Sequence, residues 1–290
     1  MEKGLKTKLQ LYSGDHPNIA DSLYTFGKAL VQHGETQQGL KYSQMALEMK
    51  RRLYSGNHYE IGCSLNTVGI GYLDLGDFEK SIEYLKASLK TFNELTPVSY
   101  EKVATLQSNI AYNYNKLGNH IEALKYAQAS VDLFKERYPD GHPRAIYSLD
   151  DLGDSLIRTN NVKQGLDVLH RALSLSKKFS IDKHFITAFI LQDLGWGYFK
   201  NKDFPTALIY TEKALNLRKE LYGTRNHHER AESLYNLGDI HLALGNKNLA
   251  LKSYQEALTM YTVLSLRYLP VYGEIKQKIN QLTNTDVLNG

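Results

Sequence analysis

Apolar residues recur at intervals of three and four along most of this 290-residue chain, which is the spacing of one face of an α-helix. The pattern is clear where two successive helical faces carry Leu65, Val68, Tyr72, Ile82, Leu85 and Leu89. In the turn between them, Gly76 suits the left-handed conformation that ends a helix, and Asp77 can cap the start of the second helix. The pattern therefore predicts pairs of amphipathic helices.

The helix pairs repeat with a nearly constant period. Small residues, which we call anchors, lie 42 residues apart, and 43 at the last step, at Gly27, Gly69, Ala111, Gly153, Gly195 and Gly238. Two more small residues follow each anchor at twelve and nineteen positions, as Ser81 and Ser88 follow Gly69. A glycine inside a helix costs about 1 kcal/mol relative to alanine, so close helix packing must offset it. The sequence predicts six copies of one helix-turn-helix unit.

This arrangement of small residues resembles the tetratricopeptide repeat. The 42-residue length and joints such as Tyr54-Ser55-Gly56-Asn57-His58 are similar to the kinesin-light-chain variety, and the likeness covers residues 12–263. It implies an all-α, right-handed α-solenoid of about six repeats with terminal capping helices, in a single domain over residues 1–290. The expected parts are an N-terminal helix or half-repeat at 1–16, repeats at 17–58, 59–100, 101–142, 143–184, 185–227 and 228–268, and a C-terminal capping helix at 269–284.

Composition narrows the class of protein. The 42% share of hydrophobic residues is too high for disorder, and no run approaches the roughly 18 apolar residues of a membrane span. The start of the chain lacks the apolar core of a secretory signal. A single cysteine, Cys63, excludes an internal disulfide framework, so we expect a reducing, cytoplasmic setting. The net charge of +4 is too balanced to indicate a nucleic-acid partner.

Residues that could carry chemistry follow the repeat instead of forming a catalytic group. Gly69-Ile70-Gly71 lies inside a predicted helix, and no Lys-Ser or Lys-Thr follows at the spacing of a phosphate-binding loop. We expect no enzyme activity, no cofactor and no metal site. The joint histidines lie a full repeat apart, so we expect their rings to cap or pack against helix starts: His16, His58, His142, His184 and His227.

Two other periodic features have structural explanations. Basic runs such as Lys50-Arg51-Arg52 and Arg218-Lys219 fall near the ends of second helices, where cations oppose the negative end of the helix dipole. A second binding surface for acidic protein, RNA or lipid headgroups is the alternative. Tyrosines fifteen positions after four anchors are expected to be half-buried packing residues: Tyr42, Tyr84, Tyr126 and Tyr210.

The resemblance also implies a binding groove. In tetratricopeptide arrays the first helix of each copy, helix A, lines the concave face, and partners contact positions six, three and two before the anchor and one, four and five after it. These offsets give the candidate groove residues Asn66, Asn109, Tyr112, Tyr147, Asp150, Asp151, Asp154, Phe189, Asp193, Trp196, Phe199, Tyr235, Asn236 and Asp239. In the last three copies these positions hold six acids, one of which is Glu232, and two bases, Arg158 and Lys200. The C-terminal part of the groove is therefore expected to be acidic and aromatic.

Such a surface suits a peptide or helical segment that carries Lys or Arg beside apolar residues. The resemblance implies that Asn109 and Asn236 stand where this family often binds the ligand backbone. Alternatively, the acids form a solvated face or pair with bases of neighbouring repeats. We predict a non-catalytic protein-interaction scaffold or adaptor, similar to the cargo-binding part of kinesin light chain. A peptide-sensing regulatory receptor and the substrate-docking part of a larger enzyme or effector stay open, as does the oligomeric state.

Overall fold

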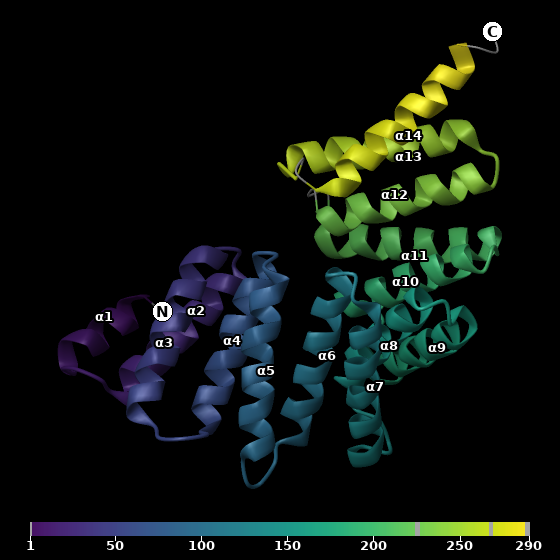
Figure 1. The fold of residues 1–290 in the computed structure, drawn as a ribbon. Helices are drawn as coiled ribbons and strands as arrows, with labels where there is room; N and C mark the ends of the chain where they lie inside the picture. Colours follow the sequence, from purple (N-terminus) through teal and green to yellow (C-terminus); the bar gives the residue numbers. More distant parts are fainter. Residues whose placement is uncertain (1, 224–226, 267–268, 288–290) are drawn as a thin grey trace. The chain divides into compact units, whose positions relative to one another are not determined.

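The structure is a computed structural model that describes residues 2–223, 227–266 and 269–287 (Figure 1). Within these ranges it contains fourteen α-helices and no strand, which confirms the predicted all-α solenoid. The helices are α1 (Glu2–Leu11), α2 (Pro17–Gln32), α3 (Thr36–Leu53), α4 (Tyr59–Asp74), α5 (Phe78–Glu94), α6 (Tyr100–Lys116), α7 (His120–Arg137), α8 (Ala145–Arg158), α9 (Val162–Lys178), α10 (Phe185–Lys200), α11 (Phe204–Tyr222), α12 (His228–Ala243), α13 (Lys247–Val263) and α14 (Pro270–Val287).

The chain forms two compact units, Met1–Asp151 and Leu152–Gly290, and each is described by itself. In the first unit, helix A and the second helix of the same copy, helix B, pack together as α2 with α3, α4 with α5 and α6 with α7; in the second unit, α10 packs with α11 and α12 with α13 (Figure 1). The second helix of a copy also packs against the first helix of the next copy within a unit, as α3 does on α4, α5 on α6, α9 on α10 and α11 on α12. A single domain with the repeat limits expected above stays a prediction.

The turns between paired helices have the predicted chemistry. Gly76 ends α4 with a φ of 77°, and the side chain of Asp77 accepts a hydrogen bond from the backbone N–H of Lys80 in α5. In the fourth and fifth copies Asn160 and Lys202 adopt the same left-handed conformation, with φ of 67° and 62°. The turn geometry is thus retained even where its glycine is absent.

The joint histidines cap helix starts, as predicted. Nδ1 of His58 accepts a hydrogen bond from the backbone N–H of Glu60 at 3.2 Å, and the imidazole stacks on Tyr54 with 4.0 Å between ring centroids. The same bond to the N–H two residues further on is accepted by His16, His142, His184 and His227. These rings therefore position the A helices, because each one satisfies a backbone donor at a helix start.

Anchor glycines lie where paired helices approach closely. A Cβ atom on Gly195 would be 2.3 Å from Oγ1 of Thr211 in the facing helix. The periodic tyrosines pack beside these crossings, since Tyr84 stacks on Tyr72 and Tyr210 on Tyr198, each with 5.4 Å between centroids. The core within each unit is therefore a seam between neighbouring helices.

Lys50 lies in the last turn of α3 and Lys219 in the last turn of α11, as expected for helix-end cations, but two residues of these basic runs also have buried side chains. Lys50 in α3 and Arg218 in α11 each lie 23 residues after an anchor, and both side chains are completely buried. Nζ of Lys50 lies 2.5 Å from Oε2 of Glu60 and 3.1 Å from Oδ1 of Asp21. Nη1 of Arg218 donates to the backbone oxygen of Glu229 at 2.9 Å. These cations join one copy to the next, so they do not form an exposed second binding surface.

Candidate functional site

In the second unit, the charges of three carboxylates act on one guanidinium, and one of the three contacts it directly. Nε of Arg158, at the end of α8, donates to both carboxylate oxygens of Asp154 at 2.7 and 2.9 Å. Burial opposes the charge of Arg158, but the charges of Asp154, Asp193 and Glu232 outweigh it and raise the pKa of the guanidinium. We call these four residues the carboxylate cluster; three acids and one base give it a formal charge of −2.

Aromatic side chains lie on α10, the helix that supplies Asp193 to the carboxylate cluster. The rings of Trp196 and Phe199 stack with 5.6 Å between centroids, and both are half-buried. Nζ of Lys200 lies 4.4 Å from the centroid of Trp196. Phe189, two turns before Trp196, covers the buried guanidinium of Arg218, with 5.3 Å between Cζ and the ring centroid. The A helix of the fifth copy thus presents both apolar area and acidic charge.

In the sixth copy, Tyr235 and Asp239 of α12 hold a lysine from α14. Nζ of Lys278 lies 2.5 Å from Oδ1 of Asp239 and donates to the hydroxyl of Tyr235 at 2.9 Å. The hydroxyl of Tyr254 in α13 donates to the same oxygen of Asp239 at 2.5 Å, and burial together with this carboxylate raises the pKa of Tyr254. We call Tyr235, Asp239 and Tyr254 the tyrosine–aspartate cluster. Asp239 is therefore paired with a base of the C-terminal helix of the same chain.

The candidate residues in the first unit have a different chemistry. Asn66 in α4 and Asn109 and Tyr112 in α6 are half-buried. Within the described part of the chain, Oδ1 of Asn66 is buried without a hydrogen-bond partner. Nζ of Lys116 lies 5.1 Å from the ring centroid of Tyr112. Amide and hydroxyl groups therefore replace the carboxylates of the second unit on these two A helices.

The start of α8, which belongs to the first unit, adds three candidates. The hydroxyl of Ser108 in α6 donates a hydrogen bond to Asp151. Asp150 is only 8% exposed, so it can contribute negative charge but little contact area. Burial raises the pKa of Tyr147, with Arg144 opposing the shift and Asp150 adding to it.

The predicted residues are thus brought together in part. Asp154 contacts Arg158 and the charge of Asp193 acts on the same guanidinium, while Tyr235 and Asp239 both contact Lys278. Asn236 lies between Tyr235 and Asp239 in the sequence of α12 and is half-buried. Lys278 was missed, although a signal for it exists: it lies 40 residues after Gly238, two before the place of a seventh anchor. That a partner binds the fourteen candidates stays a prediction.

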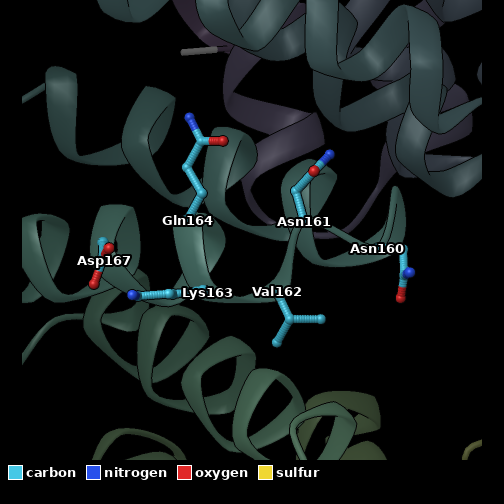
Figure 2. A pocket seen from close by; sticks show the side chains of 6 residues that line it. All are labelled: Asn160, Asn161, Val162, Lys163, Gln164 and Asp167. Atoms are coloured by element: carbon cyan, nitrogen blue, oxygen red, sulfur yellow. The ribbon is translucent and has the colours of Figure 1, made fainter.

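A hollow beside the turn between α8 and α9 has no convergent chemistry. Its volume is about 360 Å³, and it is lined by Asn160, Asn161, Val162, Lys163, Gln164 and Asp167. Figure 2 shows these side chains pointing in different directions from the turn before α9 and from the first part of α9. Because they do not point toward a common centre, we assign no ligand to this hollow.

Groups suited to covalent or metal chemistry are few. Burial raises the pKa of the Cys63 thiol, which favours the unreactive protonated form. Over the ranges that the structure describes, no three or more His, Cys, Asp or Glu side chains are grouped to hold a metal ion. In the same ranges, no helix has the length and apolar character needed to cross a membrane.

Comparison with known proteins agrees with this architecture. A sequence profile described as tetratricopeptide repeat matches residues 34–94, 102–164 and 198–262, more than half of the chain. No curated protein matches the chain in sequence.

Solved structures with a similar fold were also found. The Rap protein complexed with competence and sporulation factor has a TM-score of 0.72 at 12% identity, over 98% of this chain and 79% of that one. NprR in complex with its cognate peptide NprX has a TM-score of 0.68 at 16% identity, and the alignment covers 98% of this chain and 81% of NprR. The TPR-like repeats of a kinesin light chain from Podosopora anserina have a TM-score of 0.56 at 15% identity, and the alignment covers 73% of this chain and 100% of that one. At these identities the likeness shows a shared fold.

Proposed function

Because this chain belongs to the tetratricopeptide repeat family, we propose that it is a non-catalytic scaffold or adaptor that binds a segment of a partner protein. The proposed ligand is a peptide or helical segment with basic and apolar residues, bound along the faces of the A helices. The proposed setting is the cytoplasm, since the single cysteine of the sequence is typical of reducing compartments.

The carboxylate cluster carries this proposal. Its three acids come from three successive A helices, α8, α10 and α12, and its formal charge is −2. A lysine or arginine of a partner would reduce this excess negative charge, while the field of the cluster speeds encounter with basic segments. The guanidinium of Arg158 already binds Asp154, and the Arg158 side chain is still 38% exposed there.

The aromatic residues of α10 would supply the apolar part of recognition. Trp196 and Phe199 are half-buried and stacked, so their conformations are restricted before a ligand arrives. Tryptophan and other aromatic side chains of this kind often provide most of the binding energy at an interface. A partner residue with an apolar side chain, next to its basic residue, would contact these rings.

The comparison with NprR favours one second candidate, a receptor that senses a small peptide. That structure holds a cognate peptide and aligns with 98% of this chain. In such a receptor, the peptide would shift the arrangement of the repeats and so change the binding of another partner. Small-angle scattering with and without peptide separates the two candidates, because an adaptor needs no change in the radius of gyration.

A charge-reversal experiment tests the proposed surface. The full chain and its Asp193→Lys, Glu232→Lys double variant are titrated with a synthetic library of short peptides rich in lysine and aromatic residues. We expect the double variant to bind at least about tenfold more weakly, since two attractive contacts become repulsive. Asp167→Lys, on the exposed side of α9, is the matched control and should bind as the unchanged protein does. Equal affinity of the double variant and the control would refute the proposal.

A further inference from the structure

The tyrosine–aspartate cluster has the composition of a site for a primary ammonium group. Nζ of Lys278 lies 4.5 Å from the ring centroid of Tyr235 and 5.6 Å from that of Tyr254. The carboxylate of Asp239 and the hydroxyl of Tyr235 accept its hydrogen bonds. Aromatic faces, one negative charge and short charge-assisted hydrogen bonds are the features that hold a lysine ammonium.

The repeat register places two members of this cluster on the proposed binding side of the sixth copy. Tyr235 lies three residues before the anchor Gly238 and Asp239 lies one residue after it, which are two of the partner-contacting offsets. Lys278, in α14, lies two residues before position 280, where the repeat period would place a seventh anchor. Two residues before the anchor is also a partner-contacting offset. The ammonium therefore occupies a surface that, in the proposed function, faces the ligand.

The contact is built so that the lysine side chain can leave while its helix stays in place. Ile275 and Leu282 of α14 are buried in the core of the second unit, with exposed fractions of 0% and 9%, and hold the helix in place. The Lys278 side chain is 30% exposed, and that of Asp239 is 17% exposed. A flexible four-carbon stem can swing into solvent from such a position without unfolding α14.

We infer that Tyr235, Asp239 and Tyr254 form a lysine-binding subsite of the groove, which Lys278 occupies until a lysine of the partner replaces it. This inference rests on the proposed function and names the residue that its sixth copy recognises. The apparent affinity for a partner is lowered in proportion to the time that the subsite is occupied by Lys278. Removal of Lys278 should therefore strengthen the binding of lysine-containing ligands.

The direct test uses a probe that needs no knowledge of the partner. N-acetyl-lysine methylamide is titrated into the full chain and into Lys278→Met, and binding is followed by the NMR shifts of the tyrosine rings. We expect Lys278→Met to bind this probe at least about tenfold more tightly than the unchanged chain does. The norleucine analogue, which lacks the ammonium group, should not bind, and Asp239→Asn in the Lys278→Met background should abolish the gain.

Lys276→Met is the matched control, because it removes the same charge from the same helix at an exposed position. Circular dichroism of each variant verifies that α14 and the remaining helices are retained. If Lys278→Met binds the probe no better than Lys276→Met does, the subsite is refuted. The proposed function still stands in that case, provided that the Asp193→Lys, Glu232→Lys variant loses its peptide.

The same variants are then titrated with the tightest peptide from the basic library. A tenfold gain for Lys278→Met that disappears when the peptide lysines become norleucine supports a groove subsite. A gain with the small probe but none with the peptide would show that the cluster binds lysine outside the groove, which overturns the inference. If no library peptide binds any variant, the proposed function and the subsite fail together.

Discussion

Replacing Arg218 with methionine should destabilise the second unit by leaving a buried carboxylate without its cation. Arg218 is completely buried, and Oε2 of Glu229, whose side chain is 10% exposed, lies 3.7 Å from its Nε. Methionine fills much of the space but cannot donate to Gln192 or to the backbone oxygen of Glu229. Breaking a buried pair from one side costs about 3–5 kcal/mol, so we expect a loss near the lower limit because the hydroxyl of Tyr222 still donates to Glu229.

Lys50→Met is the matched comparison for this substitution. Lys50 occupies the same position relative to its anchor and is equally buried. Its partners differ, since the side chains of Asp21 and Glu60 are 55% and 36% exposed. Their carboxylates can regain water when the cation is lost, so we expect the free energy of unfolding to fall by no more than about 1 kcal/mol.

Urea titrations followed by far-UV circular dichroism compare the two substitutions. Trp196 is the sole tryptophan and lies in α10, the partner helix of α11, so its fluorescence reports unfolding next to Arg218. This local signal is needed because repeat arrays can unfold in parts. The double variant Arg218→Met, Glu229→Gln should recover part of the lost stability, because it removes the unpaired negative charge of Glu229. Equal destabilisation by Arg218→Met and Lys50→Met would refute the argument from the exposure of the acids.

Three further predictions concern the repeat scaffold. Gly195→Ala should lower the free energy of unfolding by about 1–3 kcal/mol, since its Cβ would lie 2.3 Å from Thr211, and an unchanged urea midpoint would contradict this close approach. Asp77→Ala should lower the melting temperature through loss of the cap on the N–H of Lys80, whereas Asp77→Asn should retain most of the stability in thermal melts. Burial lowers the pKa of His227, so its contribution to stability should be present above its unfolded pKa near 6.5 and be lost as pH falls through the lower folded value. In urea titrations between pH 5 and 7.5, the free energy of unfolding of His227→Asn should depend less on pH than that of the unchanged chain. Identical pH profiles of the two proteins would exclude His227 as a source of the pH dependence.

Much of the local structure could be predicted from the sequence because it depends on neighbouring residues. The turn at Gly76 and Asp77 and the cap at His58 each involve groups within a few positions of one another. The bond between Arg158 and Asp154 is of the same kind, since the two residues lie one helical turn apart. Even the close crossing at Gly195 could be predicted, because small residues at a constant period imply helices that touch.

The sequence by itself determined a tetratricopeptide-like array of helix pairs, since a period near 42 residues leaves few other ways to bury one face of each helix. Only the tertiary structure decided which charges meet. Lys50 contacts acids from α2 and α4, and Lys278 reaches Asp239 across 39 residues of sequence. Such pairs depend on how successive helices stack, and side chains on different helices have no fixed spacing along the chain. The acidic character expected for the last three copies is therefore reduced by Lys278, a cation from outside these copies that the count of groove charges did not include.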